Sequence, residues 1–262
     1  MAERLAKYLA THNICSRRCA EEMIVAGRVS VNGVVVTTPI TFVDDHDDVC
    51  VNGRKILTRE PARLWVYSKP RGEITTHRDP AGRRTVFEAV QSLGLPRVIS
   101  VGRLDLNSEG LLLLTTHSTL AHMLESPHNI LPRVYRVRLF GQMALRTLKP
   151  YQASPRDPTF FKMPSQTLES IHYAPWTLKL DTIPTQDQLR STHNFWATVT
   201  LTEGKNREIR KLMKALGFQV NRLIRQRYGP FQLGSLPSGK VREITTWRTD
   251  LIDAGFTLPE EL

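Results

Sequence analysis

The chain has 262 residues, 40% of them apolar, and a formal net charge of +11, which fits one large globular domain or a small domain followed by a medium-sized one. No apolar run approaches the roughly 18 residues that a membrane-spanning helix requires, and the first residues lack the apolar core of a secretory signal. The three cysteines, Cys15, Cys19 and Cys50, fit a reducing compartment better than a disulfide framework. We therefore expect a cytoplasmic protein without a membrane span.

Two of the cysteines could be taken for zinc ligands. Cys15 and Cys19 lie close together in the sequence, and His12 precedes them. A structural zinc site takes four ligands, and the sequence offers no fourth at a suitable spacing. We expect no metal site.

The first 60 residues predict two short helices followed by small strands. Apolar residues recur at helical spacing from Leu5, and Ser16 can cap a second helix that Gly27 ends. The pairs Asn32-Gly33 and Asn52-Gly53 are typical of tight turns between antiparallel strands. The acidic run at 44–48 is expected to be a solvated turn that faces away from any phosphate.

Beyond a short junction at 58–61, the sequence predicts mainly strands. The predicted elements are strands over 64–67, 98–101, 111–114, 133–140 and 196–201, a helix around 86–90, and a helix over 205–216 that ends before Gly217. Residues 149–184 contain six prolines and show no clear period, so no element is predicted there.

One acidic residue stands at an informative position. Asp105 follows Gly102-Arg103-Leu104 and precedes the wholly apolar run Leu111–Leu114, which predicts a strand buried on both faces. Asp105 is therefore expected on a loop held by a rigid core, where its carboxylate can be oriented and partly shielded from water. The alternative is a loop cap, because aspartate often accepts hydrogen bonds from nearby backbone amides.

The positive charge is unevenly distributed. The basic and acidic side chains of residues 1–60 cancel, whereas residues 201–230 carry a net charge of +6. In a helix over 205–216, Arg207, Arg210, Lys211 and Lys214 would share one side and the apolar residues the other. Concentrated positive charge indicates a polyanionic partner, and nucleic acid is the most common one. An acidic membrane surface is the rival, but no basic helix carries Trp or Phe on its apolar face.

The segment Gly102-Arg103-Leu104-Asp105, followed by Ser108–Thr115, resembles the catalytic-aspartate motif of ribosomal RNA pseudouridine synthases. Three further segments support this resemblance, and together the four touch almost the whole chain. They are Ser16-Arg17-Arg18 with Val31-Asn32-Gly33, then Val134-Tyr135-Arg136-Val137, then Glu203–Arg210. The first 60 residues resemble the alpha-L RNA-binding module of a small-subunit ribosomal protein. The group in question carries this module in front of its catalytic domain.

The resemblance implies an α+β fold in two domains. Residues 1–60 would form a small helix-helix-hairpin RNA-binding domain, and residues 61–262 a pseudouridine synthase domain built on a mixed, mainly antiparallel sheet. It also implies a reaction that needs neither cofactor nor metal, with ribosomal RNA or a pre-ribosomal particle as the partner and a monomeric enzyme.

The resemblance further implies the catalytic residues. Asp105 would be the nucleophile or base, and Arg210 matches the family position whose guanidinium pairs with this aspartate. Tyr135 matches a strand tyrosine that lies against the target base, although a strand tyrosine by itself is more often core filler. Many relatives have lysine at the position of Arg133, so a role for that residue does not carry over directly.

A larger set of cations is expected to contact RNA. In the N-terminal module the second helix and the hairpin would face the RNA, although arginines at a helix start can also serve solubility alone. Arg103 could hold a phosphate or help to flip the base, or could brace its own loop. The expected RNA-binding residues are Arg4, Arg17, Arg18, Arg28, Arg103, Lys205, Arg207, Lys211 and Lys214.

The resulting hypothesis is a pseudouridine synthase that acts on large-subunit ribosomal RNA after flipping the target base. The same activity on small-subunit RNA is the runner-up, and transfer RNA is less favoured. A different class of answer is a non-catalytic RNA-binding factor for ribosome assembly. A hydrolase lacks support because no nucleophile elbow, zinc helix motif or phosphate-binding loop occurs.

Overall fold

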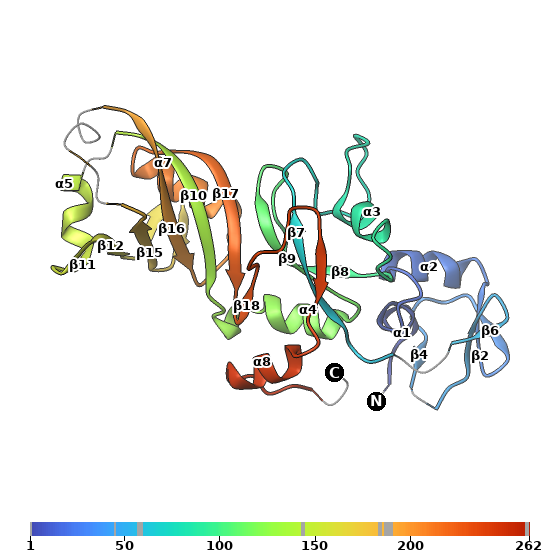
Figure 1. Ribbon diagram of the computed structural model, residues 1–262. Coiled ribbons are helices and arrows are strands. Elements are labelled where there is room, and N and C mark those ends of the chain that lie inside the picture. Colours follow the sequence, from blue (N-terminus) through green and yellow to red (C-terminus); the bar gives the residue numbers. More distant parts are fainter. Residues whose placement is uncertain are drawn as a thin grey trace.

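The computed structural model describes residues 2–44, 46–56, 60–142, 145–182, 185, 191–259 and 262, except the side chains of 145 and 146. Figure 1 shows a small N-terminal lobe at one end of the molecule and a larger body built on a long twisted sheet. Parts of the predicted acidic turn and of the predicted junction fall outside the described residues. None of the helices in the described part of the chain is both long and apolar enough to cross a membrane.

The N-terminal lobe has the predicted order of elements. Helices α1 (Leu5–Thr11) and α2 (Arg17–Val25) pack on a four-stranded sheet of order β3-β2-β5-β6, with β2 at Val29–Val31, β3 at Val34–Val36, β5 at Val49–Val51 and β6 at Arg54–Lys55. A further pair joins β1 (Glu3–Arg4) to β4 (Phe42–Val43). As predicted, the Ser16 hydroxyl caps α2 by accepting from the Cys19 amide at 3.2 Å.

This lobe has its own apolar core, which contains Leu5, Leu9, Ile24 and Val29. The described end of the acidic run is tied to the first hairpin, because the Asn32 side-chain amide donates to Asp47 at 2.7 Å and the Asp48 backbone amide donates to the Asn32 side chain at 2.8 Å. The turn therefore neighbours the hairpin tip.

The larger body is built on a mixed, mainly antiparallel sheet, as predicted, and its described residues form eleven strands. Its main path runs β11-β12-β15-β16-β10-β17-β9-β7-β19, and the one parallel pair among the described strands is β9 with β17. The strands are β7 (Leu64–Lys69), β8 (Ile99–Val101), β9 (Glu109–Thr115), β10 (Arg133–Gly141), β11 (Gln152–Ser154), β12 (Asp157–Met163), β15 (Trp176–Leu180), β16 (His193–Leu201), β17 (Gln219–Tyr228), β18 (Phe231–Gln232) and β19 (Val241–Glu243).

Helices cover the sheet in two groups, each over its own apolar core. The first core joins α3 and α7 to the central strands and includes Val90, Val137 and Leu212. The second joins α4 and α8 to β9 and includes Leu113 and Leu120. The helices are α3 (Val86–Gln91), α4 (Ser118–Glu125), α5 (Leu145–Leu148), α7 (Glu208–Ala215) and α8 (Trp247–Asp253), with single 3-10 turns at Pro127–Asn129 and Lys149–Tyr151.

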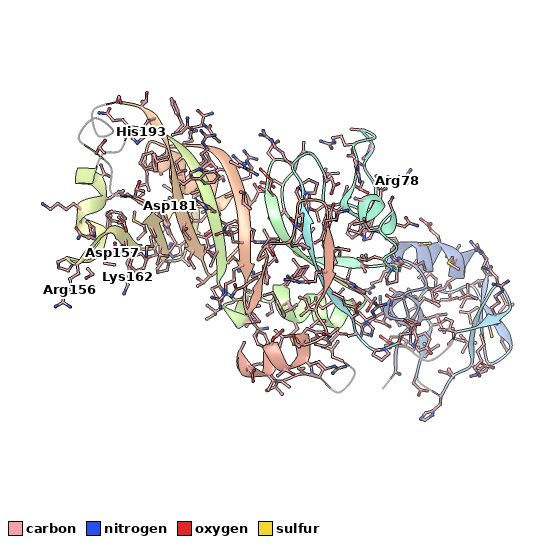
Figure 2. The ribbon with its side chains drawn as sticks, viewed as in Figure 1. Arg78, Arg156, Asp157, Lys162, Asp181 and His193 are labelled. Carbon is pink, nitrogen blue, oxygen red and sulfur yellow. The ribbon has the colours of Figure 1, made fainter. Side chains whose placement is uncertain are left out.

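The proline-rich tract contains regular structure that the sequence did not reveal. It holds β11, β12 and β15 of the main sheet and the separate hairpin of β13 (Gln166–Leu168) and β14 (Ile171–Tyr173). Pro155, Pro164 and Pro175 stand between strands, so they divide the pattern into pieces too short for a visible period. This part of the sheet forms the end remote from the N-terminal lobe, where Figure 2 labels Arg156 and Lys162.

Candidate active site

The loop that carries Asp105 is held through its backbone. Lys69, fully buried at the end of β7, donates from Nζ to the carbonyl oxygens of Pro70 at 3.0 Å, Asp105 at 3.2 Å and Ser108 at 2.9 Å. Burial lowers the pKa of Lys69 to about 8, and the nearby acids Glu73, Asp105 and Glu109 oppose that shift. Sequence reasoning missed this lysine, although its position after an apolar strand was visible.

Two further contacts come from the same side of the loop. The Gly72 amide donates to the Leu106 carbonyl at 2.8 Å, and the Thr75 hydroxyl donates to the Leu104 carbonyl at 2.9 Å. The loop backbone is therefore satisfied by the segment after β7, which leaves the Asp105 carboxylate free to interact with other groups.

The carboxylate of Asp105 faces Arg207, with 3.8 Å between Oδ2 and Nη1. The Asp105 side chain is 40% exposed and that of Arg207 52%, so water screens this ion pair. Asp105 was predicted to be partly shielded from water, and its side chain is shielded only in part.

Arg210 does not form the expected direct pair with Asp105 in the described structure. Its guanidinium donates to the Val220 carbonyl at 2.9 Å and, more weakly, to the Asn107 carbonyl at 3.5 Å. Burial and the neighbouring Arg207 lower the pKa of Arg210, whereas Asp105 raises it, so the two groups still interact through space. Arg210 thus bridges the Asp105 loop to the start of β17.

The predicted helix over 205–216 begins later than expected. α7 starts at Glu208, after Arg207 with a left-handed φ of +51°, and the Lys205 amide donates to the Glu208 carboxylate at 2.9 Å. Lys205 and Arg207 therefore belong to the turn before the helix and not to its cationic face. The buried side of α7, with Ile209, Leu212 and Met213, agrees with the prediction.

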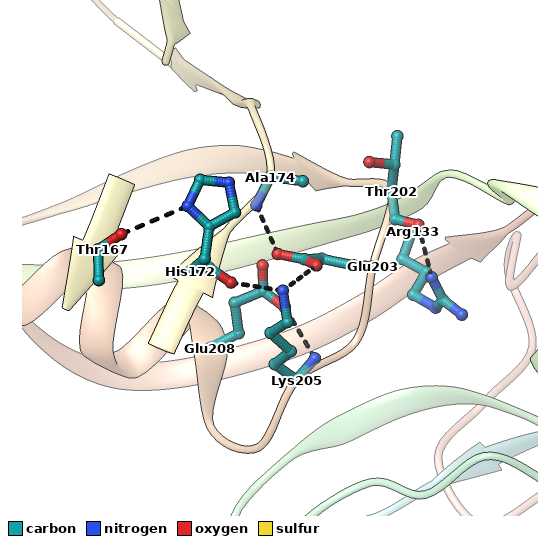
Figure 3. A network of polar contacts seen from close by, with 8 residues as sticks. All are labelled: Arg133, Thr167, His172, Ala174, Thr202, Glu203, Lys205 and Glu208. Carbon is teal, nitrogen blue, oxygen red and sulfur yellow. Dashed lines mark hydrogen bonds and ion pairs between the residues drawn. The ribbon is translucent and has the colours of Figure 1, made fainter. Parts of the chain in front are cut away.

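A network of acids and one lysine fixes this turn (Figure 3). The Lys205 ammonium donates to the Glu203 carboxylate and to the His172 carbonyl, the latter at 2.5 Å, and Glu203 also accepts from the Ala174 amide at 2.7 Å. Burial raises the pKa of Glu208 to about 7, and the adjacent Glu203 adds to this effect. The pKa of the adjacent Glu203 is lowered, with hydrogen bonds from Lys205 and from the Ala174 amide favouring its charged form, so of the two carboxyl groups Glu208 is the one that holds its proton more tightly.

Tyr135 is a nearly buried residue that lines the site. It is a β10 residue that pairs with Arg225 of β17, is 7% exposed, and packs with the apolar core of the body. Nearby, the buried Arg133 donates to the Leu131 and Thr202 carbonyls and to the Tyr228 hydroxyl.

These elements surround a cleft of about 1020 Å³. Its lining includes Asp105, Tyr135 and Arg210, so the three predicted catalytic residues share one cavity. Cations exceed acids around it: Arg103, Arg133, Lys205, Arg207, Arg210 and Arg225 line it, against Asp105, Glu125, Glu203 and Glu208. Such a cleft attracts a polyanion.

The other predicted RNA-binding residues lie in several places. Arg103 is exposed in the cleft. Lys211 is outside the cleft lining and forms an ion pair with Glu169 at 3.1 Å, and Lys214 is exposed on α7. Arg4, Arg17, Arg18 and Arg28 are all exposed on the N-terminal lobe, where Arg28 donates to Asn52 at 2.9 Å. No group of three or more metal-ligating side chains occurs in the described ranges.

Comparisons with known proteins identify the family of this chain. The family model described as RNA pseudouridylate synthase matches residues 63–215, and the S4 domain model matches residues 3–49. Ribosomal large subunit pseudouridine synthase B of Salmonella typhimurium is 39% identical over an alignment of 270 positions that covers 100% of this chain and 86% of the relative. An uncharacterized RNA pseudouridine synthase of Rickettsia prowazekii is 44% identical over 242 residues, which cover 92% of this chain and 94% of the relative.

A solved structure supports the same fold. The crystal structure of a pseudouridylate synthase superposes with a TM-score of 0.57 at 22% identity and covers 94% of this chain and 97% of that one. At this identity the likeness concerns the fold alone. The family model covers more than half of the chain, and relatives above 30% identity span nearly all of it. The chain is therefore a member of the RNA pseudouridylate synthase family, an isomerase with an S4 domain at its N-terminal end.

Proposed function

We propose that this protein converts a uridine of large-subunit ribosomal RNA into pseudouridine, with Asp105 as the catalytic carboxylate. The observation that carries the proposal is the Asp105 side chain in a cationic cleft, on a loop clamped through its backbone carbonyls. The choice of large-subunit RNA rests on the name of the Salmonella relative. The S4 domain and the excess of cations support an RNA partner.

The reaction is an internal rearrangement of one nucleotide. The bond between the ribose C1′ and the uracil N1 breaks, the ring turns, and a new bond joins C1′ to C5. C5 loses its proton and N1 gains one, so the atoms balance without an oxidant or a second substrate. In the proposal Asp105 acts either as the nucleophile or as the base, and an RNA strand that fills the cleft displaces the water that screens Asp105.

The remaining residues have binding roles in this proposal. Tyr135 stacks on the flipped uracil and offsets lost base stacking by roughly 1–3 kcal/mol. Arg207 and Arg210 balance the negative charge of the Asp105 carboxylate, and Arg103 holds a phosphate beside it. On the S4 domain Arg4, Arg17, Arg18 and Arg28 contact RNA phosphates, and Lys205, Lys211 and Lys214 add positive charge around α7.

The proposed boundary between the two domains is at residue 60. In this proposal the protein is a cytoplasmic monomer that acts on ribosomal RNA or on a pre-ribosomal particle.

The test combines a gene deletion with an active-site variant. Pseudouridines are mapped in the ribosomal RNA of cells that lack the protein, and then in the same cells supplied with the wild type, Asp105→Asn or Asp181→Asn. We expect one large-subunit site to disappear on deletion, to return with the wild type and with Asp181→Asn, and to stay absent with Asp105→Asn. Asp181 is a suitable control because it pairs with Arg136 at 2.6 Å outside the cleft lining.

Other outcomes would replace the proposal. If the deletion removes a pseudouridine from small-subunit RNA instead, the target lies in the small subunit. An unchanged map, or full rescue of ribosome assembly by Asp105→Asn, would favour a non-catalytic assembly factor.

A further inference from the structure

Arg225 is a buried cation in the middle of the sheet and has no role in the proposed mechanism above. It lies on β17 between two neighbours, Tyr135 of β10 and Gly110 of β9. The residue is 3% exposed and lines the same cleft as Asp105. Because residues directly opposite each other on adjacent strands point to the same side of a sheet, the side chains of Arg225 and Tyr135 share one face.

Most of the hydrogen-bonding capacity of Arg225 is unused. Its Nε donates to the Leu111 carbonyl at 2.7 Å, and the guanidinium carbon lies 5.1 Å from the centre of the Tyr228 ring. Nη2 is buried without an acceptor, and among the described residues Nη1 has no acceptor either. A buried guanidinium presents five N–H donors, and burying them unpaired is unfavourable.

Arg133 provides a direct comparison in the same cleft. It is also a buried arginine beside Tyr228, but it donates to the Leu131 and Thr202 carbonyls and to the Tyr228 hydroxyl. The terminal nitrogens of Arg133 therefore have protein acceptors, whereas those of Arg225 have none among the described residues.

The position of Arg225 is fixed relative to the Asp105 loop. A Cβ on Gly110, whose φ is +95°, would lie 2.3 Å from the Arg225 carbonyl oxygen and 2.9 Å from its amide nitrogen. Only glycine permits this close approach of β9 and β17. Because β9 begins directly after the Asp105 loop, this close approach fixes the backbone of Arg225 relative to the end of that loop.

The depth of this site selects the part of the RNA that reaches it. A phosphate with its charged oxygens belongs at the exposed rim, where Arg103 lies, whereas a flipped base enters the interior. A uracil ring stacked on Tyr135 brings its edge towards the neighbouring Arg225. That edge carries two carbonyl oxygens, O2 and O4, and both are hydrogen-bond acceptors. Cytosine has an amino donor in place of O4.

We propose that Arg225 donates a hydrogen bond to a carbonyl oxygen of the flipped uracil and so orients the ring in the cleft. This assignment rests on the proposed function, because it requires a uridine in the cleft. It makes Arg225 a residue that binds the reacting base in addition to the predicted Asp105, Tyr135 and Arg210.

The experiment replaces single oxygen atoms of the substrate. Full-length protein is mixed in excess with an RNA transcript that carries uridine, 2-thiouridine or 4-thiouridine at the mapped target position, and the single-turnover rate is measured. Sulfur is a weaker acceptor than oxygen. We expect one of the two thio substitutions to slow the wild type by about tenfold, the size of one lost hydrogen bond, and to slow Arg225→Met by less than about twofold.

Two controls separate this effect from damage to the fold. Arg133→Met removes a buried arginine whose two terminal nitrogens already have protein acceptors, and it should keep the full thio penalty. Arg225→Lys retains a donor for Leu111, and its thermal unfolding reports whether the strand pair is intact. The thio measurement on the wild type does not depend on any variant folding.

The outcomes distinguish the two levels of the proposal. If the wild type converts both thio-RNAs as fast as the uridine RNA, or if Arg225→Met shows the full penalty, Arg225 does not bind a base carbonyl. If the wild type converts no ribosomal RNA transcript, the proposed function fails and the assignment of Arg225 fails with it.

Discussion

Lys69 holds the main-chain carbonyl of Asp105 at 3.2 Å and that of Ser108 at 2.9 Å, so one buried ammonium fixes both ends of the loop turn. Replacing it by methionine leaves these carbonyls without their donor and frees the loop. A misplacement of roughly 1 Å can cost about 10²-fold in rate, so we expect Lys69→Met to lower the modification rate by about that factor.

The measurement is the single-turnover rate together with RNA affinity. Lys162→Met, a change of an exposed lysine on β12, is the matched control and should alter neither. A Lys69→Met protein that folds and retains the wild-type rate would show that the loop holds its position without the ammonium.

Arg207 and Arg210 are predicted to differ in importance. Arg207 faces Asp105 across 3.8 Å but both groups are well exposed, so Arg207→Gln should reduce the rate by less than about tenfold. Arg210 is half-buried and joins β17 to the Asp105 loop through the Val220 and Asn107 carbonyls. Arg210→Gln should therefore reduce the rate by about 10²-fold or more.

The comparison uses the same RNA and the same assay for both variants, with RNA affinity measured in parallel. If Arg207→Gln proves the more damaging change, the ion pair seen in the free protein matters more to catalysis than the bridge made by Arg210.

Features set by residues close together in the chain were predicted better than contacts between distant segments. Spacing predicted the Ser16 cap, the strand after Asp105 and the buried side of α7, because each depends on neighbours along the chain. The resemblance brought Asp105, Tyr135 and Arg210 into one proposed site, and the three do line one cleft.

The contacts that sequence reasoning missed join distant segments. Lys69 reaches the Asp105 loop across about 36 positions of the chain, and Arg225 reaches Leu111 across about 114. No periodic pattern encodes such contacts, since they arise only when β7, β9 and β17 lie side by side. The helix start at 208 was also missed, because the left-handed Arg207 and the bond from the Lys205 amide to Glu208 override helical spacing.

Glu208 should make stability depend on pH. Its pKa is raised to about 7 in the folded protein, while an unfolded chain releases this proton near the ordinary value of 4.5. The folded state thus binds more protons between pH 4.5 and 7, and the free energy of unfolding falls as pH rises through this window. Glu208→Gln removes the titrating group, so we expect the variant to be more stable than the wild type at pH 8 by on the order of 2 kcal/mol. At pH 5 the folded wild type is itself largely protonated at Glu208, so the difference in the free energy of unfolding should be smaller.

Urea unfolding at pH 5 and pH 8 measures this difference. Glu169→Gln, which changes an exposed carboxylate paired with Lys211, is the control and should show the pH response of the wild type. Equal pH responses of Glu208→Gln and the wild type would indicate that Glu208 does not hold a proton near neutral pH.

RNA affinity should fall steeply with salt, and the S4 domain should account for part of that slope. Each phosphate contact to folded RNA releases counterions and contributes about 0.7–0.9 to the slope of log K against log salt concentration. Arg18 is exposed at the start of α2 on the N-terminal lobe, so Arg18→Gln should reduce the slope by about that amount. Arg156 is also exposed but lies at the remote end of the sheet (Figure 2), and Arg156→Gln should leave the slope unchanged.

Filter binding of the same transcript at 50–400 mM salt, roughly the range in which this effect is large, compares the wild type, Arg18→Gln and Arg156→Gln. A flat response in the wild type would remove the electrostatic part of RNA recognition, and an equal drop for both variants would extend the RNA-binding surface along the whole sheet.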